Sequence, residues 1–182
     1  MSKSIGMVEL TTVSAGITCA DIMIKTAEVD VLQASVVCPG KYIVIISGEL
    51  SAVKASVEAA KSYKPEKVID TFVLGNPHES IFPAIYGVEC PEHTEALGIL
   101  ESYSAASAIV AADTAAKTSL VDLIELRLAK GMCGKSFLLI TGSVSSVQAA
   151  IDKAQKEAEE KGMLLDSSVI PSPDKKLWQN IL

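Results

Sequence analysis

The chain contains two copies of one pattern, and this repeat limits the folds that are open to it. Residues 5–31 match residues 97–123 at a shift of 92 places, and residues 40–53 match residues 134–147 at a shift of 94. The difference predicts a two-residue insertion in the second copy, within the stretch that matches Val31 to Gly40. We therefore expect two similar domains, residues 1–90 and 95–182, joined by a polar stretch that contains Pro91.

Each copy has the same predicted order of elements. Apolar, β-branched runs predict strands at residues 5–10, 29–37, 42–47 and 68–74, with matching strands that include 96–100 and 163–170. Between them, Ile17, Ala20, Ile24 and Ala27 recur at helical spacing, as do Val53, Val57 and Ala60 after Gly48, and both sets are predicted to face inward. The matching inward faces of the second copy are Ile109, Ala112, Ala116 and, one turn on, Leu120, and then Val147, Ala150, Ile151, Ala154 and Ala158. A short segment, 80–86 or 176–182, ends each copy. The order βαββαβ predicts an α+β fold of two tandem ferredoxin-like domains, with helices packed on one face of an antiparallel sheet.

The composition points to an assembly and away from nucleic acid and membranes. With 22 acidic against 16 basic residues, the net charge is −6, whereas a nucleic-acid surface or a polybasic membrane anchor is basic. The longest strongly aliphatic run, 43–46, is too short to span a bilayer, and the first residues lack a secretion signal. The mean hydropathy of +0.36 is high for a monomer. We expect a soluble, intracellular protein that hides apolar surface in contacts between subunits.

The residues that an enzyme needs do not form a recognisable set. His78 and His93 show neither a triad nor metal-ligand spacing, and residues 131–136 lack the first glycine of a phosphate loop, where Ala129 stands. Cys90 and His93 lie in the linker without a partner pair, and Cys19 lies in a predicted helix as a small core residue. The sequence therefore predicts a protein that is not an enzyme, with cysteines that are free thiols or metal ligands.

Several short motifs, which occur in the same order in both copies, resemble those of a known protein family. They are Ile5-Gly6-Met7-Val8-Glu9, Asp21 with Lys25, Gly40-Lys41 before a strand, and Gly48 with Val53, and the second copy repeats them from Leu97-Gly98 to Ile170-Pro171. The chain resembles the tandem-domain shell proteins of bacterial microcompartments, and its Cys-Pro-Gly-Lys turn resembles the T-type shell proteins of propanediol-utilisation compartments. The resemblance implies a homotrimer that mimics a hexamer, lies in the microcompartment shell with other shell proteins, and surrounds a central pore.

The same resemblance gives the first hairpin turn a cofactor. It implies that Cys38, with Pro39, Gly40 and Lys41 around it, binds a [4Fe–4S] cluster, one per trimer, that carries electrons across the shell. One cysteine per chain cannot supply the ligands of a cluster, but a threefold axis brings three together. Amide groups of the Gly-Lys part of the turn could donate hydrogen bonds to the sulfur atoms. The Lys41 charge, if close, would favour the thiolate and the anionic cluster. A redox enzyme in the lumen or the cytosol is an implied partner, and Cys133 is a possible additional pore thiol.

The resemblance also assigns the lateral edges of the tile. Lys25 and Lys117 match the edge lysine that packs along a neighbouring shell protein. The arginine that usually accompanies this lysine is missing, because the matching stretches read Gly75-Asn76-Pro77-His78 and Ile170-Pro171-Ser172-Pro173. Asn and Ser cannot supply the forked set of donors that arginine offers.

Two alternatives stay open on the sequence. The first is the same shell tile without a cluster, with a cysteine-lined pore that conducts or gates a small metabolite. The second is a trimeric regulator that binds a small molecule, since ferredoxin-like units also build such sensors. The regulator would be a discrete trimer that gains thermal stability with a ligand, whereas a tile would form sheets or tubes.

Overall fold

A computed structural model describes residues 4–87 and 94–181 of the chain. The chain divides into two compact units, Met1–Pro77 and His78–Leu182. Cys90, His93 and most of the linker predicted between the two domains lie outside the described residues. The repeat boundaries at these positions therefore stay a prediction.

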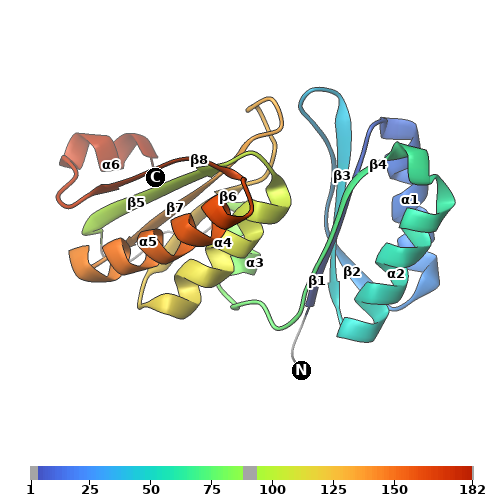
Figure 1. Cartoon of the computed structure of the whole chain (residues 1–182), viewed down its shortest axis with the longest axis horizontal. Coiled ribbons are helices and arrows are strands. Elements are labelled where there is room, and N and C mark those ends of the chain that lie inside the picture. The colour runs from blue at the N-terminus through green and yellow to red at the C-terminus, as the bar shows by residue number, and fades with distance from the viewer. Residues whose placement is uncertain (1–3, 88–93, 182) are drawn as a thin grey trace. The chain divides into compact units, whose positions relative to one another are not determined.

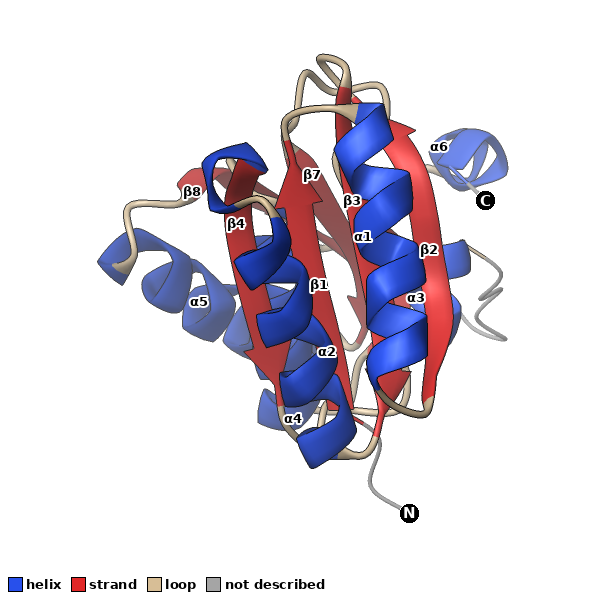
Figure 2. Cartoon of the chain, turned by 90° about the vertical axis from the view of Figure 1, so that its right-hand side faces the viewer, coloured by secondary structure: helices blue, strands red, loops and turns tan. Residues whose placement is uncertain are grey.

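The first unit is a four-stranded antiparallel sheet with two helices on one face. Its elements are β1 (Ser4–Leu10), α1 (Val13–Thr26), β2 (Val29–Val37), β3 (Lys41–Gly48), α2 (Leu50–Tyr63), a 3₁₀ turn at Pro65–Lys67 and β4 (Val68–Leu74). The strand order is β2-β3-β1-β4, with every neighbouring pair antiparallel. Figure 2 shows α1 and α2 side by side across this sheet.

The second unit repeats this architecture and adds two short helices. After α3 (Ile81–Tyr86) come β5 (Ala96–Ser102), α4 (Ala105–Thr118), β6 (Asp122–Arg127), β7 (Ser136–Gly142), α5 (Val144–Glu160), β8 (Leu164–Ile170) and α6 (Lys175–Ile181). The order β6-β7-β5-β8 equals that of the first unit, with antiparallel pairs throughout. Helices α4 and α5 cover one face of the sheet and α6 lies on the other (Figure 1). The predicted α+β fold is confirmed.

Matching side chains start the first helix of each unit. The Thr12 hydroxyl accepts a hydrogen bond from the Ala15 amide at 3.4 Å, and the Ser104 hydroxyl, at the matching position of the repeat, accepts one from the Ser107 amide at 3.1 Å. Such N-caps satisfy amides that have no partner inside the helix. The first turn of each helix is therefore fixed by a residue that the repeat preserves in chemical type.

The predicted apolar face of α1 is partly wrong. Ile17 and Ile24 are exposed, and the buried face of this helix consists of Ala15, Gly16, Cys19, Ala20 and Met23. Four of these five residues are small, which lets α1 lie close to the sheet, and the two isoleucines point away from it. Leu120, predicted to continue the face of the matching helix, is exposed because α4 ends at Thr118. The predicted inward faces of α2 and α5 are confirmed.

Cys19 is a core residue, as predicted. Its side chain is fully buried, and its thiol lies 3.8 Å from the Ala60 carbonyl oxygen. Burial raises the pKa of Cys19, with a smaller opposing influence from the Lys64 charge. A thiol held neutral and out of solvent is a poor metal ligand. Within the described residues, no helix is both long and apolar enough to span a bilayer.

Candidate functional site

The first hairpin presents Cys38 at the tip of a three-residue turn. Cys38 is a free, half-buried thiol between β2 and β3, and it is joined to Pro39 by a cis peptide bond. Gly40 has a φ of +91°, a conformation that side chains disfavour, and a Cβ there would meet nothing within 4 Å. The turn is thus closed by the glycine backbone, and no neighbouring atom crowds that position.

The turn uses its own amide to hold its shape. The Gly40 N–H, which the sequence offered as a donor to bound sulfur, donates to the Val37 carbonyl oxygen at 2.9 Å. This bond closes the hairpin immediately before β3 begins at Lys41. The geometry of the turn is therefore set within the chain, and the Gly40 amide is already engaged.

Lys41 is tied to the sheet by an ion pair that the sequence analysis did not predict. Its ammonium lies 3.0 Å from a carboxylate oxygen of Glu9 on β1, and the Glu9 side chain is 91% buried, with 9% of its surface exposed. Because the Lys41 ammonium is paired with the Glu9 carboxylate, the two charges together attract a negative group at Cys38 less strongly than a lone ammonium would. A signal was available, because Glu9 with Lys41 recurs as Glu101 with Lys135.

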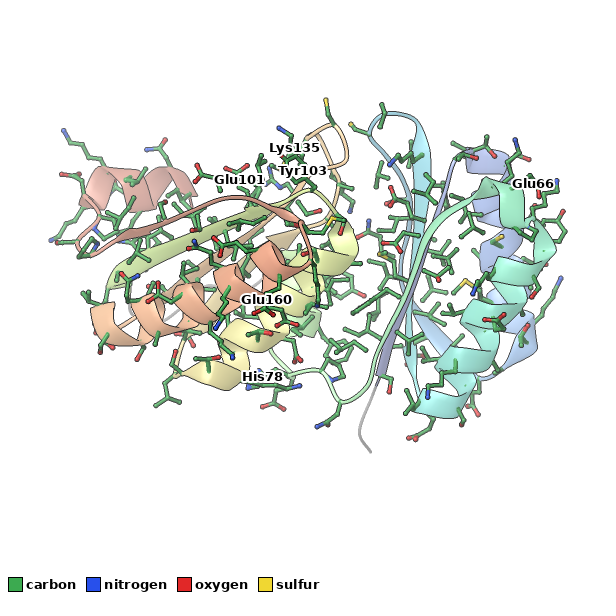
Figure 3. The ribbon with its side chains drawn as sticks, in the orientation of Figure 1. Glu66, His78, Glu101, Tyr103, Lys135 and Glu160 are labelled. Atoms are coloured by element: carbon green, nitrogen blue, oxygen red, sulfur yellow. The ribbon has the colours of Figure 1, made fainter. Side chains whose placement is uncertain are left out.

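The second hairpin is longer, and the predicted insertion lies there. Residues 128–135 connect β6 to β7, whereas residues 38–40 connect β2 to β3. Leu128 and Ala129 are buried at its base, where the Ala129 amide donates to the Ser136 hydroxyl at 3.1 Å. Cys133 is a free, exposed thiol in this loop, with a φ of +53°. Lys135 lies at the same end of the sheet as Glu101 and Tyr103 (Figure 3), as the pairing of Ser102 with Ser136 requires.

The described part of one chain offers an incomplete donor set for a metal cluster. Among the described residues, no group of three or more His, Cys, Asp or Glu side chains is placed to hold a metal ion. The hairpin tip supplies one accessible thiol, Cys38, and the chemistry of a thiolate suits iron–sulfur ligation. These residues fit a cluster that is shared between copies of the chain, each giving one ligand from its first hairpin.

The two predicted edge lysines lie at the same place in matching helices but differ in support. Lys25 pairs with Asp21 at 2.7 Å, and Lys117 pairs with Asp113 at 2.7 Å, each one turn apart near the helix end. Asp113 is nearly buried and also accepts a hydrogen bond from the His78 amide at 2.8 Å. Lys117 is therefore held by a carboxylate that is itself fixed, whereas the pair of Lys25 is open to solvent.

A small cavity lies beside the Lys117 edge. It has a volume of about 240 Å³ and is lined by His78 and by residues at the end of α4, at the start of β6 and at the end of β7. The His78 Nδ1 atom lies 2.8 Å from the Ser80 hydroxyl, and His78 is at the opposite end of this unit from Lys135 (Figure 3). No sequence motif marked Asp113 and His78 as a pair, because they meet only in the folded unit.

Helix α5 carries one carboxyl group whose pKa is shifted. Burial alone would raise the pKa of Glu157, but hydrogen bonds from Thr114 and Lys161 and the nearby Lys161 and Lys153 charges outweigh it and lower the pKa below 4.5. The contact from Thr114 joins α4 to α5. This group has a structural role between the two helices of the second unit.

The fold and the repeated hairpins define a class of protein. The model of the BMC domain, the bacterial microcompartment shell domain, matches residues 4–77 and 96–173, so the chain belongs to this family of shell proteins. It is a structural, non-enzymatic protein of the bacterial microcompartment shell, and proteins of this family associate with other shell proteins. The predicted class is confirmed, and this finding sets the small-molecule regulator aside.

Particular relatives cover either the whole chain or one half of it. The chain is 37% identical over 182 residues to the microcompartment shell protein PduT of Citrobacter freundii, covering 100% of this chain and 99% of PduT. A crystal structure of a microcompartment protein from Desulfitobacterium hafniense DCB superposes with a TM-score of 0.94 at 47% identity, covering 98% of this chain and 99% of that one. The carboxysome shell protein CcmK2 of Synechocystis sp. is 34% identical over 85 residues, 44% of this chain and 82% of CcmK2.

Proposed function

We propose that this shell protein is a homotrimer whose six similar domains surround a central pore, and that Cys38 of the three chains binds one [4Fe–4S] cluster there. The position of Cys38 carries the proposal, because the thiol lies at the tip of a short hairpin and belongs to no complete ligand set among the described residues of one chain. The full-length likeness to PduT supports the same assignment. When bound, the cluster would supply one-electron transfer between the two sides of the shell.

The residues around the turn would hold the thiol in place. The bond from the Gly40 amide to the Val37 carbonyl fixes the turn, and the pair of Lys41 with Glu9 fixes the first residue of β3 to the neighbouring strand. A thiol on a rigid support needs little reorganisation when it coordinates iron. The partners in electron transfer would be redox enzymes in the lumen or the cytosol.

We further propose that Lys25 and Lys117 lie at the lateral edges where shell proteins meet. Both are near the end of a surface helix, and both ammonium groups are partly or largely exposed. The different support of the two lysines gives the two edges different rigidity. A tile of this kind would present alternating edges around its threefold axis.

The test is the iron and acid-labile sulfide content of protein purified without oxygen. One cluster per trimer corresponds to about 1.3 iron atoms per chain. We expect Cys38→Ser to lose the iron and the visible absorbance, and Cys133→Ser, the matched control in the second hairpin, to keep both. Iron near zero after reconstitution would instead support the pore without a cluster. Iron retained by Cys38→Ser but lost by Cys133→Ser would move the ligand to the second hairpin.

A further inference from the structure

The two hairpins differ in how their charges are balanced. In the first, Lys41 is the only charged residue within residues 31–48, and it is paired with the Glu9 carboxylate. The second hairpin carries Lys130 and Lys135, and residues 126–151 contain no Asp or Glu, although the whole chain has a net charge of −6. Within the described residues, neither of these two lysines forms an ion pair. The second hairpin therefore presents two uncompensated positive charges on an acidic protein.

The loop that carries these lysines is braced by its own chain. Arg127, the last residue of β6, has its guanidinium 2.7 Å from a carboxylate oxygen of Glu125 and 5.0 Å from the centre of the Phe137 ring. Further along the loop, the Lys135 amide donates to the Met132 carbonyl oxygen at 3.0 Å. The arginine is thus engaged at the base of the hairpin, and the positive charge that stays available to a partner comes from the two lysines.

Apolar side chains are exposed at the start of α4 and before β8. The Tyr103 amide donates to the Met163 carbonyl oxygen at 2.9 Å, and these two residues are 53% and 38% exposed. The first unit makes the same contact between the Thr11 amide and the Lys67 carbonyl oxygen, also at 2.9 Å. The backbone contact is therefore repeated, whereas its side chains are apolar in one unit and polar in the other. The shared fold does not require an exposed aromatic ring at this place.

The exposed ring and the unpaired charge lie at one end of the second unit. Figure 3 shows Tyr103 and Lys135 at this end, together with Glu101. Exposed aromatic and methionine side chains are enriched where proteins dock, and charges around them select a partner by its sign. We name Tyr103, Lys130, Lys135 and Met163 the second-hairpin patch. It combines apolar contact area with positive charge, and both features distinguish it from the matching place in the first unit.

We propose that the second-hairpin patch binds the acidic surface of a small one-electron carrier protein, which exchanges electrons with the cluster at Cys38. This inference rests on the proposed function. The second hairpin is the repeat counterpart of the first, so the pseudosymmetry of the proposed trimer places both kinds of hairpin around the pore. The first hairpins then hold the cluster, and the second hairpins surround it with unpaired lysines.

Charge decides the class of partner. Three chains carry three times −6, or −18, so the trimer as a whole repels an acidic protein and favours its approach only where positive charge gathers. An acidic carrier is thereby directed to the pore, where a cluster would be within reach. In the transfer, one electron leaves the reduced carrier and one enters the oxidised cluster, and no bond forms or breaks. The same contact serves the reverse transfer.

The test separates docking from electron transfer by using the Cys38→Ser trimer, which lacks the proposed cluster ligand. The probe is an oxidised plant-type [2Fe–2S] ferredoxin with an acidic surface, titrated at low ionic strength by calorimetry. We expect Lys130→Glu with Lys135→Glu to weaken binding at least about tenfold relative to the control Lys54→Glu with Lys156→Glu. The control makes the same change in net charge on exposed helix residues away from the patch. The difference should shrink in about 1 M salt, where charges are screened beyond about 3 Å.

The apolar part of the patch and the electron transfer have their own measurements. Tyr103→Ser should weaken ferredoxin binding at both low and high salt, because an aromatic contact is not screened. In the parent trimer, reduced ferredoxin mixed in a stopped-flow instrument should reduce the cluster at least about tenfold faster than in the Lys130→Glu, Lys135→Glu variant. Iron content should be equal in these two proteins.

The outcomes distinguish this inference from the proposed function. Ferredoxin that does not bind at low salt, or that binds both double-lysine variants equally, would overturn the docking surface, while iron that depends on Cys38 would leave the cluster standing. Binding that depends on Lys130 and Lys135 in a protein that takes up no iron would support the patch and overturn the cluster. Binding and reduction that both depend on the two lysines support the whole inference.

Discussion

Gly16 of α1 is packed against the ring of Tyr42, the second residue of β3, and this contact supports the base of the Cys38 hairpin. A Cβ added at Gly16 would overlap the Tyr42 ring carbons and lie 2.5 Å from the Tyr42 Cβ, whereas carbon atoms in contact prefer about 3.5–4.0 Å. Because the Tyr42 Cβ is bonded to the strand, rotation of the side chain cannot relieve this overlap. We therefore predict that Gly16→Ala forces the helix and the strand apart.

The size of the effect follows from two opposing contributions. Alanine gains about 1 kcal/mol over glycine inside a helix, and overpacking a tight core costs about 3 kcal/mol when the backbone must move. The expected net loss in the free energy of unfolding is therefore about 2 kcal/mol. The control is Gly75→Ala, where the nearest atom, Cδ1 of Leu50, would lie at 3.7 Å, so the change should stay within about 0.5 kcal/mol.

The second unit suggests a rescue of this variant. At the positions that match Gly16 and Tyr42 the second unit has Ala108 and Ser136. The helix residue there carries a methyl group, and the strand residue has no aromatic ring for it to overlap. Tyr42→Ser alone should cost about 3 kcal/mol, since it leaves a cavity. The double variant Gly16→Ala with Tyr42→Ser should be about 2 kcal/mol more stable than the sum of the single effects predicts. Denaturant midpoints at fixed protein concentration, followed by circular dichroism, measure this. Strictly additive effects, or a Gly16→Ala variant as stable as the parent, would refute the reasoning.

Three further predictions concern charges. Lys41→Met leaves the Glu9 carboxylate almost buried and unpaired, so we expect a loss of about 1–3 kcal/mol in a denaturant titration, against less than about 1 kcal/mol for the exposed control Lys25→Ala. Lys25→Ala together with Lys117→Ala should weaken the formation of sheets seen by electron microscopy while thermal unfolding changes little, and unchanged sheets would contradict the edge role. Hydrogen bonds and positive charges lower the pKa of Glu157 in the folded state. Its ionised carboxylate therefore stabilises the folded protein fully at a pH above the pKa of the unfolded state. This stabilisation is lost as the pH falls through the lower pKa of the folded state. The difference in melting temperature between the parent and Glu157→Gln should therefore be present at pH 7 and shrink below pH of about 4.5, and a pH-independent difference would contradict it.

The order of the elements could be predicted because each one has a local cause. Strands β2 and β4 begin and end at the predicted residues, since β-branched runs there are bounded by turns or polar stretches. The repeat placed the insertion between the positions that match Val31 and Gly40, and the structure has the longer connection there, with β6 shorter than β2. Local patterns of this kind survive folding because strand pairing and helix caps act over a few residues.

The faces of the helices were harder to predict. Helical spacing alone gave Ile17 and Ile24 the same inward face as Ala20, but in the folded unit Cys19 and Met23 are buried and the two isoleucines are not. Periodicity identifies an apolar stripe without saying which element covers it. Ile109 shows the difference, since it holds the same repeat position as Ile17 and is buried.

The sequence by itself determined the two-unit α+β architecture, the family, and the position of Cys38 in a tight turn, because repeats, turn residues and strand runs are local and additive. Only the tertiary structure decided that Lys41 is paired with Glu9, that the Asp113 carboxylate accepts a hydrogen bond from the His78 amide, and that Ile109 is buried while its repeat match Ile17 is exposed. These pairings join residues that are far apart in the chain. Their energies depend on burial and distance, which exist only once the strands and helices are packed.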